Sequence, residues 1–541
     1  MVFWSLYKIF SYKKKNNFMA LISKKLNLTN LFDQPKSNIL SGLVVAFAMI
    51  PEAIAFSGIA GVPPEVGLFG AFCLSITIAF VGGRNGMITS ATGSTALLMT
   101  GVVAYGESLG EGLGLSYLLA AGILTGVFQI IWGYLRLAYQ MRFVPTGVLS
   151  GFVNALALLI FQAQLPQLGI DFSHSANISK DVLNKYPTGL QIPIVWILVL
   201  IGLLIIYGLP RLTKILPSQL VAIIVITVIS VFLDLKIPTV SNLGQLPEGL
   251  PTFFIPFGDF ASGKVPFNLN TLGVILPTAL AISLVGLMET FLTQDILDDM
   301  TDSNSNKNIE ARGQGIANII SSMFGGMAGC ALVGQSVMNT ENGGRTRLST
   351  FASGISLLSL ILIAKPWLKL IPMAALVSVM ITIAISTADI QGLKNIKRIP
   401  KSDTVVMLTT FSVTMLTTPH NLALGVIAGV AMAGILFSRK VAKVIKVSET
   451  ALDENTVKYK VEGQLFFVSK IYFIQGFNIH EHKKLVKIDM SNAHIWDQSG
   501  VNALDQIIRK LKSGGSEVEV IGLNTESLDL FKKLGGLGPS H

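Results

Sequence analysis

The 541-residue sequence is poor in cysteine, histidine and charge, and each shortage excludes a class of protein. The two cysteines, Cys73 and Cys330, lie in apolar segments and predict no disulfide framework. No His, Cys or Asp cluster has zinc spacing, and no nucleophile, base and orienting group are recognisable together. We therefore expect no metal, no cofactor and no enzyme activity.

Charged residues make up only 13% of the chain, against about 25% in ordinary soluble proteins. Hydrophobic residues make up 51%, and the mean hydropathy is +0.61. A membrane-spanning helix needs about 20 mostly apolar residues, and several windows approach or reach that length. We predict a polytopic α-helical membrane protein with about fourteen transmembrane segments. The predicted ranges are 38–57, 65–81, 88–105, 114–134, 147–166, 192–208, 217–234, 270–294, 313–326, 331–341, 348–364, 366–387, 403–417 and 420–437.

The net charge of +10 reflects basic residues between apolar runs, which favours a membrane protein over a nucleic-acid-binding one. If the lysine-rich segment 1–37 is cytoplasmic, alternation places most basic loops on the cytoplasmic side. The sequence thus predicts a multi-pass protein of the cell inner (plasma) membrane with both termini in the cytoplasm. Met19 is an alternative start to Met1, since the preceding residues suggest no structural element. The cytoplasmic loops would contain Arg84, Arg136, Lys307, Arg312, Arg345, Arg347, Lys394, Lys397 and Arg398.

The predicted transmembrane domain, residues 38–437, divides into two sets of seven segments, at about 38–235 and 268–437. The third segment of each set is short and interrupted by glycine: ITSATGSTALLM from Ile88 and MAGCALVGQSVM from Met327. Repeats with an odd number of segments must be inverted in the membrane, and such matched interruptions indicate a transporter binding site. The alternative is that the glycines only permit close helix packing.

The composition changes after the last apolar run, and residues 448–541 predict a small cytoplasmic α/β domain. TVKYKV and GQLFFVSK predict two strands, and a later helix would place Val501, Leu504, Ile508 and Leu511 on one face. This domain is expected to bind or regulate. It could also be a signalling platform.

Acidic residues inside apolar runs are costly and are often functional. Glu289 lies within TALAISLVGLMETFLTQDI, with Thr293 one helical turn later, and Glu52 follows Pro51. Each carboxylate could carry a coupling ion, or it could be structural. Nearby Asp295, Asp298, Asp299 and Asp302 predict a solvated helix end without calcium-loop spacing.

Several motifs together resemble the SulP family of inorganic anion transporters. They are IPEAIAFSGIAGVPPEVGLFGAF from Ile50, GGRNGMITSATGSTALL from Gly82 and FGGMAGCALVGQSVMNTENGGRTRLS from Phe324. The tail resembles a STAS domain, with DQSG at residues 497–500. The resemblance implies a 7+7 inverted repeat, a homodimer, and an anion site between the facing ends of the third and tenth helices.

Neither interrupted segment contains lysine or arginine, so helix N-termini would supply the positive potential for an anion. Gln335 stands where some family members have arginine, so the site lacks a fixed cation. The predicted substrate-binding residues are Thr92, Gly93, Ser94, Thr95, Cys330, Ala331, Leu332 and Val333.

The resemblance implies secondary active transport of an oxyanion of the sulfate or bicarbonate class. Glutamate at position 289 is similar to proton-coupled relatives, whereas sodium-coupled bicarbonate relatives have aspartate with a nearby threonine. Many relatives have glutamine in place of Glu52. We predict proton symport through Glu289, with sodium coupling, an uncoupled channel and an exchanger as alternatives. Ser499 matches a serine that is phosphorylated in soluble STAS proteins.

Overall fold

The structure is a computed structural model that describes residues 34–136, 144–170, 187–212, 217–244, 246–259, 263–417, 422–478 and 483–534. Most of the predicted N-terminal segment, including Met19, lies outside these residues. The chain divides into two compact units, one of residues 1–400 and 407–428 and one of residues 401–406 and 429–541. Each unit is described by itself below.

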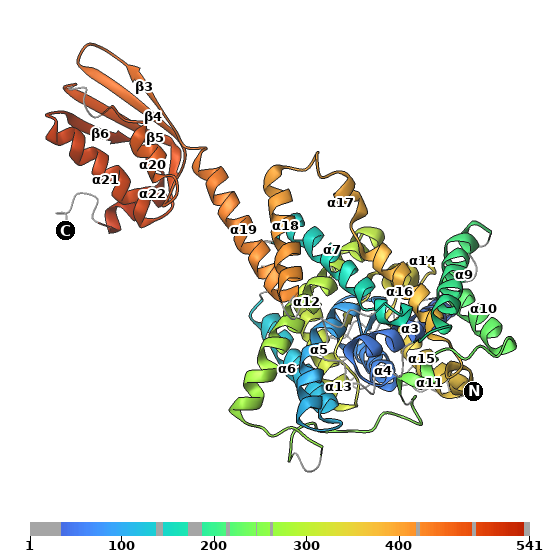
Figure 1. Ribbon diagram of the computed structural model, residues 1–541. Coiled ribbons are helices and arrows are strands. Elements are labelled where there is room, and N and C mark those ends of the chain that lie inside the picture. Colours follow the sequence, from blue (N-terminus) through green and yellow to red (C-terminus); the bar gives the residue numbers. More distant parts are fainter. Residues whose placement is uncertain are drawn as a thin grey trace. The chain divides into compact units, whose positions relative to one another are not determined.

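A helix overlaps each of the fourteen predicted ranges (Figure 1). Within the described residues, eight stretches are long and apolar enough to cross a membrane, so the exact number of crossings stays a prediction. The first seven helices are α3 (Pro35–Ala60), α4 (Pro64–Val81), α5 (Gly93–Leu109), α6 (Leu113–Tyr134), α7 (Thr146–Gln162), α9 (Gln191–Leu212) and α10 (Ser218–Phe232). The second seven are α12 (Leu269–Thr301), α13 (Lys307–Met323), α14 (Val333–Glu341), α15 (Arg347–Leu368), α16 (Met373–Thr387), α18 (Lys401–Leu416) and α19 (Leu422–Ala442). Shorter helical pieces are η3 (Leu165–Leu168), α11 (Val240–Leu243) and α17 (Ile390–Lys394).

The two interrupted segments meet in a short antiparallel pair of strands. Strand β1 (Thr89–Ser90) pairs with β2 (Cys330–Ala331), with Thr89 opposite Ala331 and Ser90 opposite Cys330. Each strand leads directly into a helix, β1 into α5 and β2 into α14. Because the strands run in opposite directions, the two helices begin at one place from opposite sides, as an inverted repeat requires.

Close contact around this pair depends on small residues. A side chain at Gly329 would collide with the carbonyl of Ser90, which lies across the strand pair. Farther out, Gly126 of α6 and Gly315 of α13 each lie against the other's carbonyl oxygen. Glycine is therefore required where these backbones approach one another, as in other membrane helix interfaces.

Several helices of this unit share an apolar core. Buried residues of α3, α4, α9, α10, α15 and α16 form one cluster, in which Val45, Met49 and Leu68 are fully buried. Burial of this kind stabilises helix packing by close van der Waals contact, since lipid is as apolar as the core.

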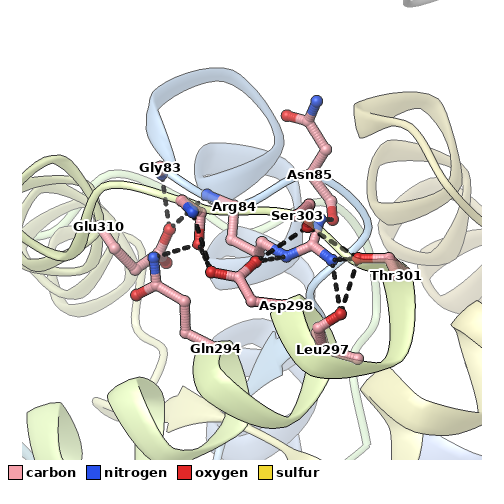
Figure 2. Close-up of polar contacts among 10 residues, drawn as sticks. Gly83, Arg84, Asn85, Gln294, Leu297, Asp298, Thr301, Ser303 and Glu310 are labelled. Carbon is pink, nitrogen blue, oxygen red and sulfur yellow. Dashed lines mark hydrogen bonds and ion pairs between the residues drawn. The ribbon is translucent and has the colours of Figure 1, made fainter.

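A polar cluster anchors the end of α12 to the loop between α4 and β1 (Figure 2). Arg84 Nε lies 2.7 Å from Asp298 Oδ1, and both side chains are at most 13% exposed. The Arg84 guanidinium also donates to the Leu297 carbonyl and to Thr301 Oγ1, at 3.0 and 2.6 Å. Glu310 Oε2 accepts from the backbone N–H groups of Gly83 and Arg84.

This cluster corrects the prediction of a solvated acidic helix end for Asp298 alone, because Asp295, Asp299 and Asp302 are exposed as predicted. Asp298 is part of a largely buried network and also accepts from the Ser305 N–H and hydroxyl groups, at 2.9 and 2.6 Å. Asp295 follows the prediction better, because its carboxylate is 57% exposed and pairs with Lys307. Spacing along the helix could not separate the two aspartates, since Arg84 comes from a distant part of the sequence.

The second unit contains a four-stranded sheet in the order β3-β4-β5-β6, covered by helices (Figure 1). Its elements are β3 (Lys446–Ala451), β4 (Thr456–Leu465), α20 (Lys470–Gln475), β5 (Leu485–Ile495), α21 (Gln498–Ser513), β6 (Glu517–Ile521) and α22 (Thr525–Lys533). Strands β3 and β4 are antiparallel, and the other pairs are parallel. The predicted apolar face of α21 is confirmed, because Val501, Leu504, Ile508 and Leu511 are all buried.

The prediction of two separate strands before α20 was wrong. One strand, β4, continues through Gly463, whose φ of +114° accompanies an irregularity in the pairing with β5 near Glu462. The chain then turns, because Ser469 Oγ accepts from the Phe466 N–H at 2.9 Å, just before α20 begins.

We expect Arg84→Met to destabilise the protein by about 3 kcal/mol, because it leaves Asp298 buried without its partner. The double variant Arg84→Met/Asp298→Leu should recover part of that loss. The measurement is thermal unfolding of the purified protein. Lys307→Met is the matched control, since it breaks an exposed ion pair that contributes about 1 kcal/mol or less. Equal losses of stability in Arg84→Met and Lys307→Met would show that the Arg84–Asp298 pair stabilises the protein no more than an exposed ion pair does.

Candidate functional site

The candidate site is formed where α5 and α14 begin on either side of the β1–β2 pair. Thr92 is the N-cap of α5, and its hydroxyl accepts from the Thr95 N–H, while the Thr95 hydroxyl accepts from the Thr92 N–H. This reciprocal pair satisfies two backbone donors and fixes the first turn of the helix. The N–H groups of Gly93 and Ser94 are the remaining donors of that turn. Gly93 itself is required, since a side chain there would press on Ile160 and Phe56.

The start of α14 differs, because its N-cap Leu332 has no side chain that can accept a hydrogen bond. The Leu332 N–H donates to the Ile88 carbonyl at 2.9 Å, and the Ala331 N–H donates to Thr290 Oγ1 at 3.3 Å. The donors of α14 that remain for an anion begin at Val333. A side chain added at Gly334 would meet no atom within 4 Å, so this first turn borders open space.

Glu289 of α12 connects the start of α5 with strand β2. Its Oε2 accepts from the Ser94 hydroxyl at 2.7 Å and from the Cys330 thiol at 2.8 Å. Thr92 Oγ1 lies 3.1 Å from Ser94 Oγ and 3.2 Å from Cys330 Sγ. One carboxylate oxygen thus lies at the point where donors from α5 and from β2 converge.

The electrostatics of this place suit a negative group. A carboxylate at the N-terminus of α5 interacts favourably with the helix dipole and with the unpaired N–H groups of the first turn. No lysine or arginine occurs in α5 or α14. Among the described residues, no group of three His, Cys, Asp or Glu residues could hold a metal ion.

Thr293 is buried one turn beyond Glu289, as its spacing predicted, but its hydroxyl contacts the main chain. Thr293 Oγ1 donates to the Glu289 carbonyl oxygen at 2.8 Å. The carboxylate of Glu289 is instead engaged by Ser94 and Cys330.

Glu52 lies on α3 and forms a pair that sequence reasoning missed. Its Oε1 accepts from Gln335 Nε2 of α14 at 2.5 Å, and both side chains are buried. The resemblance had marked both positions as unusual. Many relatives were expected to have glutamine in place of Glu52, and some to have arginine in place of Gln335. Together they place a carboxylate–amide pair, without a cation, in the first turn of α14.

Ala331 lies at the site through its backbone only. Successive residues of a strand point to opposite faces, so Cys330 faces Glu289 while Ala331 packs with Met87 and Leu297 in an apolar cluster. The structure therefore brings together Thr92, Ser94, Cys330 and Glu289 by side chain, and it leaves Ala331 and Leu332 in supporting positions.

Ser499 lies in the first turn of α21 in the other unit. Asp497 is the N-cap, and its carboxylate accepts from the N–H groups of Gly500 and Phe467, both at 2.8 Å. The serine is partly exposed, and its phosphorylation stays a prediction.

Comparisons with known proteins agree with this architecture. A model of the "Sulfate permease family" matches residues 36–410, and a model of the "STAS domain" matches residues 448–537. The "Putative sulfate transporter YbaR" of Bacillus subtilis is 44% identical over 504 residues, covering 93% of this chain and 98% of its own. The "Bicarbonate transporter BicA" of Picosynechococcus is 30% identical over 424 residues, covering 77% of this chain and 71% of its own.

A solved structure shows the same fold over almost the whole chain. The murine Slc26a9 anion transporter, determined in its inward-facing state, has a TM-score of 0.79 at 16% identity. It covers 98% of this chain and 94% of its own. The predicted resemblance and fold class are confirmed: this chain belongs to the sulfate permease family of membrane anion transporters and ends in a STAS domain.

Proposed function

We propose that this protein is a secondary active transporter of inorganic oxyanions, of the sulfate or bicarbonate class, and that Glu289 couples transport to protons. The observation that carries the proposal is the position of the Glu289 carboxylate between the start of α5 and the strand β2 that leads into α14, held by Ser94 and Cys330. A substrate anion needs the same donors. The carboxylate and the anion therefore compete for one place.

Protonation resolves this competition. A neutral carboxylic acid no longer repels an incoming anion, and it accepts hydrogen bonds more weakly than a carboxylate. The Ser94 hydroxyl and the Cys330 thiol can then rotate toward the substrate, alongside the N–H groups of Gly93, Ser94 and Val333. Release of the proton restores the bonds to Glu289 and expels the anion. One proton and one anion thus move together.

Glu52 is a second group in this scheme. Its partner Gln335 is neutral, so the pair adds no positive charge to the site. A protonated Glu52 could accompany a divalent anion, whereas a monovalent anion such as bicarbonate needs only one proton for neutrality.

Sodium coupling is the alternative, favoured by the buried Thr293 next to Glu289. The proton scheme has the stronger support, because the Glu289 carboxylate contacts hydrogen-bond donors, whereas a cation requires acceptor oxygens around it.

The remaining parts of the proposal follow from charge and family. The protein works in the cell inner membrane as a homodimer surrounded by lipid, with both termini and the STAS domain in the cytoplasm. The transmembrane domain is taken as 38–437 and the STAS domain as 448–541. The STAS domain regulates transport, and Ser499 is its candidate phosphorylation site.

Glu289→Gln tests the coupling. The variant should fold, should lose anion accumulation driven by an inward proton gradient, and should keep exchange of anions down their own gradient. The measurement is uptake of radiolabelled sulfate and bicarbonate by proteoliposomes under imposed pH or Na⁺ gradients. Glu111→Gln, which alters an exposed carboxylate beyond the end of α5, is the matched control. Proton-driven accumulation at the natural level in Glu289→Gln would reject the scheme, and uptake driven by Na⁺ at constant pH would establish the sodium alternative.

Ser94→Ala tests the anion site. A hydrogen bond to a charged group contributes about 1.5–3 kcal/mol to the binding free energy. Without the Ser94 hydroxyl, the KM for the anion should therefore rise about tenfold or more. Ser94→Thr keeps the hydroxyl and should restore most of the affinity. Ser108→Ala, at the exposed far end of α5, is the control. An unchanged KM in Ser94→Ala would place the anion elsewhere.

A further inference from the structure

A polar pocket of about 380 Å³ lies between the end of α6 and the start of α13, away from the candidate site. Tyr134 and Arg136 line it from the α6 side, and Asn308 and Arg312 line it from α13. No acidic residue lines the pocket. The proposed transport function makes no use of it.

The two arginines give the pocket a positive charge. Neither Arg136 nor Arg312 forms an ion pair in the part of the chain that the structure describes. Arg312 is held in place, because its guanidinium lies 4.9 Å from the centre of the Tyr134 ring and its Nε donates to the Asn308 carbonyl at 3.2 Å. Its terminal nitrogens remain as donors, in the forked geometry that suits phosphate oxygens.

Neighbouring acidic groups do not neutralise this charge. Glu310, two residues from Asn308 and from Arg312 on α13, accepts from the Gly83 and Arg84 N–H groups. Asp295 pairs with Lys307. Among the described residues, neither of these carboxylates is therefore available to the basic side chains of the pocket.

Asn308 provides an independent sign of a ligand. Its side chain is only 8% exposed, it lines the pocket, and its buried Oδ1 has no hydrogen-bond partner among the described residues. A buried carbonyl oxygen without a partner is costly, and the NH₂ group of the same amide is a donor that an anion can accept from. The backbone N–H groups of Asn308 and Ile309 are already bonded to Asn306, so the helix terminus itself adds nothing.

The position of the pocket indicates where the ligand comes from. Helix α6 is long and apolar enough to cross the membrane, and Arg136 follows its last turn. Tyr134 is 68% exposed beside it, and aromatic side chains are enriched where membrane helices meet lipid headgroups. Basic pockets between membrane helices at the cytoplasmic surface bind anionic headgroups.

We propose that this pocket binds a phosphate group, presented by an anionic phospholipid or by free phosphate, through Arg136, Arg312 and Asn308. The same helix α13 supports β2, because the Gln314 and Asn318 amides bond to the Gly329 carbonyl next to Cys330. A bound phosphate would therefore stabilise the helix that positions one side of the candidate site.

The test is thermal stability of the purified full-length protein in a neutral detergent, titrated with short-chain phosphatidylglycerol, short-chain phosphatidylcholine, or inorganic phosphate at constant ionic strength. We expect stabilisation by phosphatidylglycerol or phosphate, and none by phosphatidylcholine. Removing each arginine should raise the half-maximal concentration about fivefold. Arg136→Gln/Arg312→Gln should raise it about 25-fold, which removes the effect over the concentrations at which the natural protein responds. Arg398→Gln, which removes an exposed charge elsewhere, should leave the effect unchanged.

The titrations with phosphatidylglycerol and with inorganic phosphate distinguish a lipid headgroup from free phosphate. Stabilisation by phosphatidylglycerol alone assigns the pocket to lipid, and stabilisation by inorganic phosphate that Ser94→Ala leaves intact assigns it to free phosphate. No stabilisation by either, or stabilisation that survives in Arg136→Gln/Arg312→Gln, overturns the proposal. If the double variant does not fold, Asn308→Leu replaces it: the proposal requires loss of the ligand effect, and an unchanged effect rejects it.

Discussion

The requirement that every backbone polar group inside a membrane find a partner governs this structure. The chain breaks two helices at the middle of the domain, which would expose N–H and C=O groups to an apolar surrounding. The β1–β2 pair and nearby side chains satisfy most of them: Leu332 bonds to Ile88, and Asn318 bonds to both the N–H and the C=O of Gly329. The groups left over are the first N–H donors of α5 and α14. The same constraint that makes the break costly thus leaves an anion-binding position.

The helices could be predicted from the long apolar runs, because a run of about 20 apolar residues by itself indicates a membrane helix. The glycine interruptions at Ile88 and Met327 also predicted where the two halves meet, since only a broken helix needs such residues in both. The apolar face of α21 was also predicted, from the helical spacing of its apolar residues. In each case the information is local to one segment of sequence.

Partnerships between distant segments could not be read in this way. Glu52 and Gln335 are 283 residues apart in the sequence, and only the fold shows that these two side chains form a hydrogen bond. Asp298 is four residues from Asp302 on the same helix end, yet Arg84 reaches only one of them. The direction of the Ala331 side chain depends on the register of a two-residue strand, which no periodicity can set. Sequence therefore located the site to a few residues but did not decide which of them face it.

The absence of a fixed cation changes what the proposed site must do. Where a site contains an arginine, the protein itself supplies the charge that balances the substrate. Here Gln335 is neutral, and the acidic groups in contact with the site are the carboxylates of Glu289, bonded to Ser94, and of Glu52, bonded to Gln335. Helix dipoles supply only about half an elementary charge each, so two of them offset one negative charge. With Glu289 ionised, that charge is already present, and an anion would be the second. Under the proposed mechanism, protons are therefore a condition for binding as well as a source of driving force.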